Sequence, residues 1–266
     1  MSSSAPKLHV DDLSMTFGTP AGAFAALAPI TLTIDQGRFV SLIGPSGCGK
    51  STIFNVIAGL LEPTGGRVLI DGVDATGTIG RVGYMLQKDL LLPWRTVLDN
   101  VILGMEIQNL PLRAARERAL PLLHRYGLSG FEYLYPSALS GGMRQRAAML
   151  RTLLFDTDEI LLDEPFGALD AQTKLQMQEW LMALWSDFGK TVLFVTHDIE
   201  EAIYLSDELH VMGTRPGRIV ASIPVNLPRP RVRTSALTPE FLAIKQQCLE
   251  LLDVNIAPSA PLNEAA

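Results

Sequence analysis

The stretch Gly44-Pro45-Ser46-Gly47-Cys48-Gly49-Lys50-Ser51 is the part of this 266-residue chain from which its fold can be predicted. It follows an apolar run at 39–43 and precedes a helical pattern, which is the strand, loop and helix order of a phosphate-binding loop. Its three glycines let the backbone turn tightly and direct N–H groups inward at the positive end of a helix. Lys50 is expected to reach the β- and γ-phosphates of a nucleoside triphosphate, and the Ser51 hydroxyl to hold Mg²⁺. The remaining residues assigned to this site are Gly44, Pro45, Ser46, Gly47, Cys48, Gly49 and Thr52.

Around this phosphate loop (residues 44–51), apolar strands alternate with helices. Short buried strands are predicted at 160–162 and 192–196, with a helix from about Ala171 to Asp187 between them. This alternation implies a parallel sheet that helices cover on both faces. Alternating segments at 13–17 and 30–34, separated by a turn rich in Gly, Ala and Pro, predict a small antiparallel layer. The predicted fold class is therefore α/β, a P-loop NTPase (RecA-like) core with an antiparallel β subdomain.

The character of the chain changes between residues 90 and 154, which are rich in Leu, Ala and Arg at helical spacing. We expect these residues to form a helical subdomain inserted into a domain that spans 1–233. The segment 226–233 holds three prolines and three arginines and is predicted to be an exposed connector. Residues 234–266 would form a C-terminal helix and tail, with either a regulatory role or simple packing. The apolar stripe expected to pack in this helix is Phe241, Leu242, Ile244, Cys248, Leu249 and Leu252.

Composition and charge exclude several classes of protein. No apolar stretch reaches the roughly 18–20 residues that span a bilayer, and the first residues lack the pattern of a secretory signal. Two cysteines make a disulfide framework unexpected, in agreement with a cytosolic location. A net charge of −6 argues against a general affinity for nucleic acid, which needs a basic surface. A local basic patch remains open at Arg229, Arg231 and Arg233.

A second motif, Asp163-Glu164, ends the apolar segment 160–162. Ligands of a doubly wound sheet bind beyond the carboxyl ends of its strands, so Asp163 should face the same crevice as Lys50 and hold Mg²⁺ there. Glu164 would then be placed to polarise a water in line with the γ-phosphate. One residue before the strand, Glu159 stands where an apolar residue is expected, and we predict that it shortens the strand.

A third motif, Leu139-Ser140-Gly141-Gly142, joins directly to a helical run and supplies a second helix N-terminus able to bind an anion. With this motif the chain resembles the ATP-binding subunits of ABC transporters, over about residues 8–214. Position 143 departs from the family pattern, because Met stands where Gln is usual. Within that family the resemblance is to importers of nitrate, taurine, aliphatic sulfonates and bicarbonate.

The resemblance implies roles for further residues. Gln87 matches the glutamine that contacts Mg²⁺ and senses the γ-phosphate, and His197 matches the histidine that touches the γ-phosphate. Asp170 matches a loop that crosses the interface between two subunits. Phe17 matches the aromatic residue that stacks on adenine, although a lone Phe on an alternating strand can equally belong to the core. His9, His124 and His210 match no motif and are expected to be structural.

The resemblance also implies partners. Ser140, Gly141 and Gly142 would contact ATP held by a second ATP-binding subunit, most simply a second copy of the chain. Transmembrane permease subunits would bind the exposed segment 91–95, together with neighbouring residues 97–101, although packing inside the helical subdomain is the alternative for these residues. A substrate-binding protein would take part only indirectly. The resemblance implies that this subunit is peripheral, at the cytoplasmic face of the cell inner membrane.

Two other functions use similar motifs. A soluble ABC ATPase acting on nucleic acid or ribosomes would share the nucleotide site, but the chain has one cassette, no long coiled-coil insertion and no basic excess. A P-loop kinase or GTPase would leave the Ser140 motif unexplained, and the guanine-reading Asn-Lys-x-Asp motif does not occur. The predicted function is therefore ATP hydrolysis that energises an importer, with ATP and Mg²⁺ as cofactors and no nucleic-acid partner.

Overall fold

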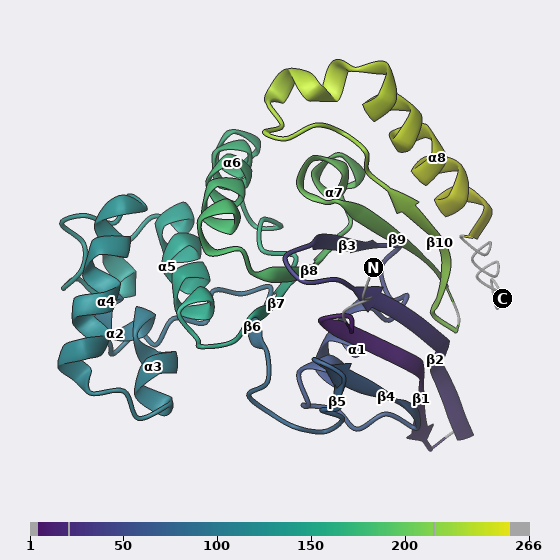
Figure 1. The fold of residues 1–266 in the computed structure, drawn as a ribbon, viewed down its shortest axis with the longest axis horizontal. Coiled ribbons are helices and arrows are strands. Elements are labelled where there is room, and N and C mark those ends of the chain that lie inside the picture. Colours follow the sequence, from purple (N-terminus) through teal and green to yellow (C-terminus); the bar gives the residue numbers. More distant parts are fainter. Residues whose placement is uncertain (1–4, 21, 215, 256–266) are drawn as a thin grey trace, which may run out of the picture.

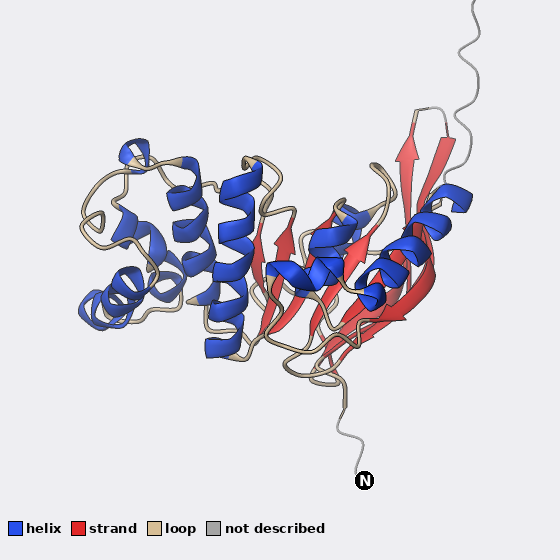
Figure 2. Ribbon diagram, turned by 90° about the horizontal axis from the view of Figure 1, so that it is seen from above, coloured by secondary structure: helices blue, strands red, loops and turns tan. Residues whose placement is uncertain are grey.

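The protein has a two-lobed architecture in a computed structural model that describes residues 5–20, 22–214 and 216–255. A larger lobe holds both β-sheets, and a smaller lobe of helices lies beside it (Figures 1 and 2). The strand order of the main sheet is β10-β9-β3-β8-β7-β6, and all neighbouring pairs are parallel except β9 with β10. Its strands are β3 (Phe39–Ile43), β6 (Gly83–Met85), β7 (Glu159–Asp163), β8 (Thr191–Thr196), β9 (Glu208–Gly213) and β10 (Arg218–Pro224).

The central strands of this sheet are covered on both faces. Strands β3, β7 and β8 are buried at every position, which explains their continuous apolar runs. Helix α1 (Lys50–Ile57) covers one face of the main sheet and lies between it and the antiparallel sheet. The shared core there includes Phe54 and Leu161. Helices α6 (Ala171–Phe188) and α7 (Ile199–Leu205) cover the other face. Glu159 does not shorten β7 as expected, because Lys7 forms an ion pair with its buried carboxylate, 3.3 Å away.

The antiparallel sheet has the order β2-β1-β4-β5. The expected turn between 17 and 30 is wrong: β1 and β2 form one long hairpin in which the chain reverses between Thr19 and Gly22. The Gly- and Ala-rich stretch completes ladder hydrogen bonds there, with register shifts that bend the ribbon. The bounds of these strands are β1 (Leu8–Thr19), β2 (Gly22–Ile34), β4 (Gly65–Ile70) and β5 (Val73–Asp74).

The helical lobe is built by residues 97–153. Its helices share a core with the main sheet, in which Leu98, Ala119 and Leu150 are buried, and α5 packs directly on β6. Its elements are α2 (Val97–Val101), α3 (Leu103–Ile107), α4 (Leu112–Arg125), the 3-10 helix η1 (Pro136–Ala138) and α5 (Gly141–Leu153). No helix in the described part of the chain is both long and apolar enough to cross a membrane.

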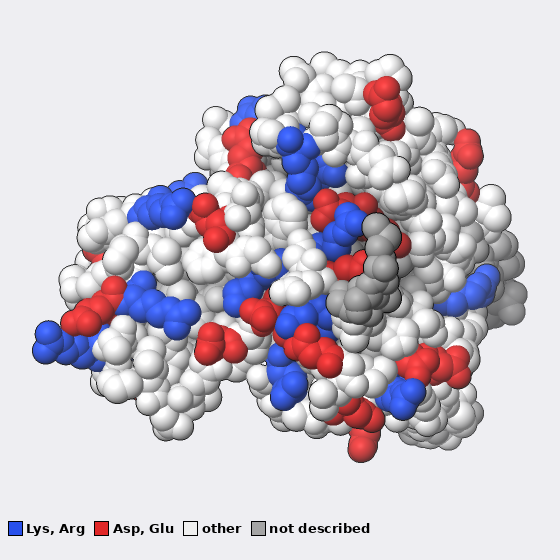
Figure 3. Space-filling model, in the orientation of Figure 1, with Lys and Arg blue, Asp and Glu red and all other residues white. Residues whose placement is uncertain are grey.

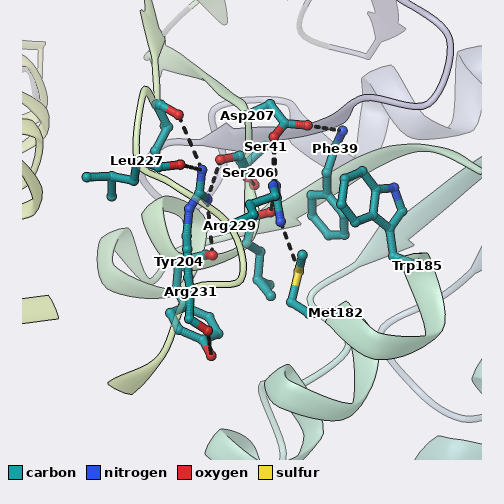
Figure 4. Close-up of polar contacts among 12 residues, drawn as sticks. Phe39, Ser41, Met182, Trp185, Tyr204, Ser206, Asp207, Leu227, Arg229 and Arg231 are labelled. Atoms are coloured by element: carbon teal, nitrogen blue, oxygen red, sulfur yellow. Dashed lines mark hydrogen bonds and ion pairs between the residues drawn. The ribbon is translucent and has the colours of Figure 1, made fainter. Parts of the chain in front are cut away.

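The segment 226–233 is only in part the exposed connector that its prolines and arginines predicted, because Arg231 is buried and Arg229 is half-buried while five of its residues are exposed. Arg231 is buried and donates hydrogen bonds to five backbone carbonyls, those of Ile203, Tyr204, Ser206, Val225 and Leu227 (Figure 4). Arg229 pairs with Asp207 and lies over the Trp185 ring, with its guanidinium carbon 4.4 Å from the ring centroid. These two arginines therefore form no basic patch, because both turn inward to bind the end of α7.

The C-terminal elements are η2 (Arg233–Leu237) and α8 (Pro239–Asn255), which lies over α7 and β9 (Figure 1). Phe241 and Cys248 are buried as expected, whereas Leu242 and Leu249 are exposed. Those two residues fall outside the narrow stripe of α8 that meets the core. The predicted tail at 256–266 lies outside the described residues. Basic and acidic side chains are interspersed over the face shown in Figure 3.

Candidate active site

The phosphate loop connects the end of β3 to the start of α1. Gly49 has φ +100°, and a Cβ atom at this position would lie 2.4 Å from Leu27 Cδ2, so only glycine fits without displacement. The Lys50 side chain is 7% exposed, and its Nζ donates hydrogen bonds to Gly44 O at 2.7 Å and Pro45 O at 3.1 Å. Cys48 is buried beside it, and burial raises the pKa of its thiol. The ammonium group is thus held inside the loop, at the end of the helix that would face phosphate.

A cleft of about 410 Å³ opens at this loop, between the β1–β2 hairpin and the carboxyl ends of the sheet strands. Ten of the residues predicted from the sequence line it. They are Phe17, Ser46, Gly47, Gly49, Lys50, Ser51, Thr52, Gln87, Asp163 and Glu164.

The buried Asp163 carboxylate lies beside Ser51 at the end of β7. The pKa of Asp163 is raised by burial. A hydrogen bond with Ser51 and the charge of Lys50 offset this increase only in part. Burial and Asp163 together raise the pKa of the neighbouring Tyr84 phenol. Among the described residues, no group of three or more His, Cys, Asp or Glu side chains could hold a metal ion. The Ser51 and Asp163 oxygens nevertheless fit Mg²⁺, which commonly takes one or two protein oxygens together with substrate phosphates.

Three residues from separate parts of the chain meet at one carboxylate oxygen. Glu164 Oε2 accepts a hydrogen bond from Gln87 Nε2 at 3.2 Å, and His197 Nδ1 lies 3.4 Å from the same oxygen. Glu164 has φ +44°, and its N–H donates to Val195 O at 2.9 Å. This turn directs the Glu164 side chain into the cleft beyond the strand end. The three residues predicted to be catalytic therefore form one polar cluster.

The hairpin contributes a second aromatic residue that sequence reasoning missed. Phe24 lies opposite Phe17 in the β1–β2 register, and both line the cleft. Phe17 is partly buried and packs against the core, whereas Phe24 is 49% exposed. Phe24 lies in the Gly- and Ala-rich stretch that the sequence predicts to be a turn, so no strand pattern marks it.

Eight predicted site residues are not among those that line the cleft. Gly44, Pro45 and Cys48 belong to the phosphate loop and His197 adjoins the cleft through Glu164, whereas the other four lie at two helix ends. Ser140 caps the N-terminus of α5 by accepting a hydrogen bond from Met143 N, and Asp170 caps α6 by accepting from Gln172 N and Thr173 N. The two helix ends are neighbours, since a Cβ atom on Gly142 would lie 3.0 Å from Thr173 Cγ2. Ser140, Gly141, Gly142 and Asp170 thus belong to a second surface.

The other histidines have structural contacts. His9 and Thr33 share a hydrogen bond across the hairpin, and His124 lies 2.7 Å from Glu132. His210 is buried in β9 beside Ser222, and burial lowers its pKa to about 4.

Comparisons with known proteins place this geometry in a family. The family model described as "ABC transporter" matches residues 27–167. The chain belongs to the ABC transporter family. An uncharacterized ABC transporter ATP-binding protein of Methanocaldococcus jannaschii is 44% identical over 95% of this chain and 94% of its own length. The taurine import ATP-binding protein TauB of Yersinia pestis is 42% identical over 84% of this chain and 90% of its own length.

Solved ABC cassettes have the same fold. The dimeric structure of a bacterial ABC transporter cassette superposes with a TM-score of 0.72 and is 32% identical, covering 83% of this chain and all of that one. A dimeric post-hydrolysis state bound to ADP and Pi gives the same TM-score at 31% identity, with the same coverage. The fold class and the ABC ATPase family predicted from the sequence are therefore confirmed, and the ABC chain is an ATP-binding ATPase.

Proposed function

We propose that this ABC ATPase is the subunit that energises an importer of a small solute, with ATP held between two copies of the chain. The observation that carries the proposal is the meeting of Gln87, Glu164 and His197 at the cleft that the phosphate loop lines. Phosphoryl transfer needs positioned polar groups of this kind more than covalent chemistry.

Each polar group in the cleft has a proposed task. Lys50 and the loop N–H groups would bind the β- and γ-phosphates, for which Nζ must leave the Gly44 and Pro45 carbonyls. Glu164 would accept a proton from the attacking water, and His197 would donate a hydrogen bond to the γ-phosphate. Bound through Ser51, Asp163 and Gln87, Mg²⁺ would supply positive charge that neutralises the phosphate oxygens.

The second copy would complete the site. Ser140, Gly141 and Gly142 lie at a helix N-terminus outside their own cleft, where the helix dipole favours an anion. Asp170, at the neighbouring helix end, would lie at the same interface. The proposal is supported by the dimeric state of the solved cassettes described above. Because both subunits would hold the γ-phosphate, its hydrolysis would let the dimer reopen.

We place the permease docking surface beside the segment 91–95 that the sequence suggested, because part of that segment is buried. Leu91, Val97 and Val101 are buried in the core of the helical lobe, whereas Trp94 is 71% exposed. An apolar groove of about 270 Å³ lies between the two lobes, and Ile79 and Ile107 are exposed in it. We propose that an apolar helical segment of the permease binds this docking groove, lined in part by Leu60, Ile79, Leu103, Ile107, Arg151 and Phe155.

Such docking would hold the subunit peripherally at the cytoplasmic face of the inner membrane. The similarity to TauB supports a small sulfonate or a related anion such as nitrate as the transported solute. This chain would not contact the solute itself, because its own cleft fits a nucleotide.

The variant Glu164→Gln tests the proposed site. It keeps the hydrogen-bonding shape of the side chain and removes the proton acceptor, so ATP binding should persist while turnover falls about 100-fold or more. Size-exclusion chromatography with ATP should then give a stable dimer that ADP does not support. Hydrolysis at the rate of the unaltered chain would contradict the role of Glu164, and an ATP-bound monomer would contradict the shared site.

A further inference from the structure

The residues that directly follow Gln87 are held by the helical lobe. Arg151 on α5 donates from Nη1 to Leu90 O at 2.8 Å and from Nη2 to Asp89 O at 2.6 Å. Arg144, two turns earlier on the same helix face, donates from Nε to Asp89 Oδ2 at 3.2 Å. The planar guanidinium of Arg151 binds two adjacent carbonyls at once, which a point charge such as Lys cannot do with the same geometry.

The next part of the segment is held in the same way by α2. The buried Asn100 side chain donates to the carbonyls of Leu92, Arg95 and Thr96, and its Oδ1 accepts from Leu92 N. Residues 89–96 are therefore bound on both sides to elements of the helical lobe. Gln87, two residues earlier, contacts Glu164 in the cleft. Only Lys88 separates Gln87 from the bound residues 89–96. A displacement of Gln87 would therefore pull on α5 and α2.

Helix α5 also carries the surface offered to the partner. Its N-terminus presents Ser140, Gly141 and Gly142, and Arg151 lies near its C-terminus. On the same helix, the buried Gln145 donates a hydrogen bond to Pro165 O, directly after Glu164. One rigid helix thus connects the Gln87 segment, the turn after Glu164 and the anion-binding end.

We propose that Arg151 is a positioning residue that couples the Gln87 segment to helix α5. Through this contact, the position of Gln87 in its own cleft sets where Ser140–Gly142 meet the nucleotide of the partner subunit. The inference rests on the proposed function of the two-copy site. The Arg151 contact is the route by which the nucleotide of each subunit affects the site that it shares with its partner.

Two further observations place Arg151 at a junction. Its side chain lines the docking groove beside Leu103 and Ile107, so a permease segment seated there would touch the residue that binds Asp89 and Leu90. Burial lowers the pKa of Arg151, which the Asp89 charge partly opposes, and an Arg side chain remains charged under such conditions. The contact of Arg151 with the carbonyls of Asp89 and Leu90, called the Arg151 relay below, therefore stays charged and bidentate at neutral pH.

The test compares Arg151→Gln and Arg151→Lys with the unaltered chain. Neither variant changes a residue of the cleft, so the KM for ATP should stay within about twofold while kcat falls about 10- to 100-fold for Gln and less for Lys. Arg113→Gln is the matched control, since Arg113 lies on α4 in an exposed ion pair with Glu117. Its kcat should equal that of the unaltered chain.

A distance measurement separates coupling from simple support of the fold. Spin labels would be attached at two exposed positions, Arg118→Cys on α4 and Glu62→Cys in the larger lobe, and the distance between them would report the separation of the lobes. Both native cysteines are buried, so the labels should react with the introduced cysteines. In the Glu164→Gln background, ATP should change this separation, and Arg151→Gln should abolish the change while ATP still binds.

The outcomes are distinct. An unaltered chain that neither hydrolyses ATP nor dimerises would refute the proposed function itself. If the unaltered chain is active, equal kcat and an equal ATP-dependent distance change in both Arg151 variants would overturn the Arg151 relay. A parallel loss of ATP affinity and thermal stability in Arg151→Lys would also overturn it, because Arg151 would then only support the fold.

Discussion

Phe17 and Phe24 face each other across the β1–β2 hairpin, yet they differ in what their rings can do. The Phe17 ring packs in part against the core, whereas about half of the surface of Phe24 is exposed, and both residues line the cleft. A purine ring can stack only on an aromatic face that is free. At the residue scale, Phe24 is therefore the better candidate for contact with the base, and Phe17 supports the wall behind it.

The two aromatic residues can be separated by substitution. Phe24→Ala should weaken binding of a fluorescent ATP analogue by about 1–3 kcal/mol with little change in thermal stability, because it removes a stacking surface and no core volume. Phe17→Ala should lower the melting temperature as well, because it removes side-chain volume from a packed cluster. Unchanged ATP affinity in Phe24→Ala, with a loss in Phe17→Ala, would restore the assignment made from the sequence.

At the scale of elements, the segment after β10 shows how composition can mislead. Prolines and arginines are typical of exposed connectors, but here Arg231 supplies donors for carbonyls at the end of α7, where the helix leaves them without partners. Arg229 satisfies Asp207 and the carbonyl of Leu205 at the same place. The segment that precedes η2 and α8 is thus tied to the end of α7.

The fastening can be measured by unfolding. Arg231→Met leaves several buried carbonyls unpaired, so the free energy of unfolding should fall by about 2–4 kcal/mol in urea titrations. Arg233→Met is the control, because Arg233 makes an exposed ion pair with Glu179 and should cost at most about 1 kcal/mol. Equal losses in the two variants would show that the buried contacts of Arg231 add no stability.

The sequence predicted those elements whose signals are local. The phosphate loop, the Asp163-Glu164 pair and the Ser140 motif each depend on a few consecutive residues, and the fold follows from their order. Phe24 and Arg231 depend instead on partners far along the chain, through hairpin register and long-range hydrogen bonds. The site roles of Gln87 and His197 came from family resemblance, and their contact with Glu164 is visible only in three dimensions.

At the scale of the whole molecule, the groove between the lobes is where we propose that the permease binds. It is lined by both lobes and touches α5, so a segment bound there would contact the elements that carry Gln87 and Ser140. On the face shown in Figure 3, basic and acidic side chains are interspersed. That face therefore offers no broad surface of one charge for electrostatic docking of a partner.

Charge placed in the groove should disrupt that contact. Ile107 is 67% exposed, and Ile107→Glu should reduce recovery of the detergent-solubilised permease of the same transporter about 10-fold or more in a pull-down. ATP binding by the isolated chain should not change. Trp94→Glu tests the neighbouring segment, and Leu237→Glu on η2 is the matched control. Full permease recovery with Ile107→Glu would place the contact elsewhere.

The left-handed backbone of Glu164 has a consequence for engineering. An L-residue costs about 1–2 kcal/mol in that region, and glycine would remove much of this cost at position 164. A selection for heat resistance alone would therefore reward the loss of the residue proposed to activate water. Any stabilised version of this protein should be chosen by turnover as well as by melting temperature, because the strained turn and the chemistry occupy the same position.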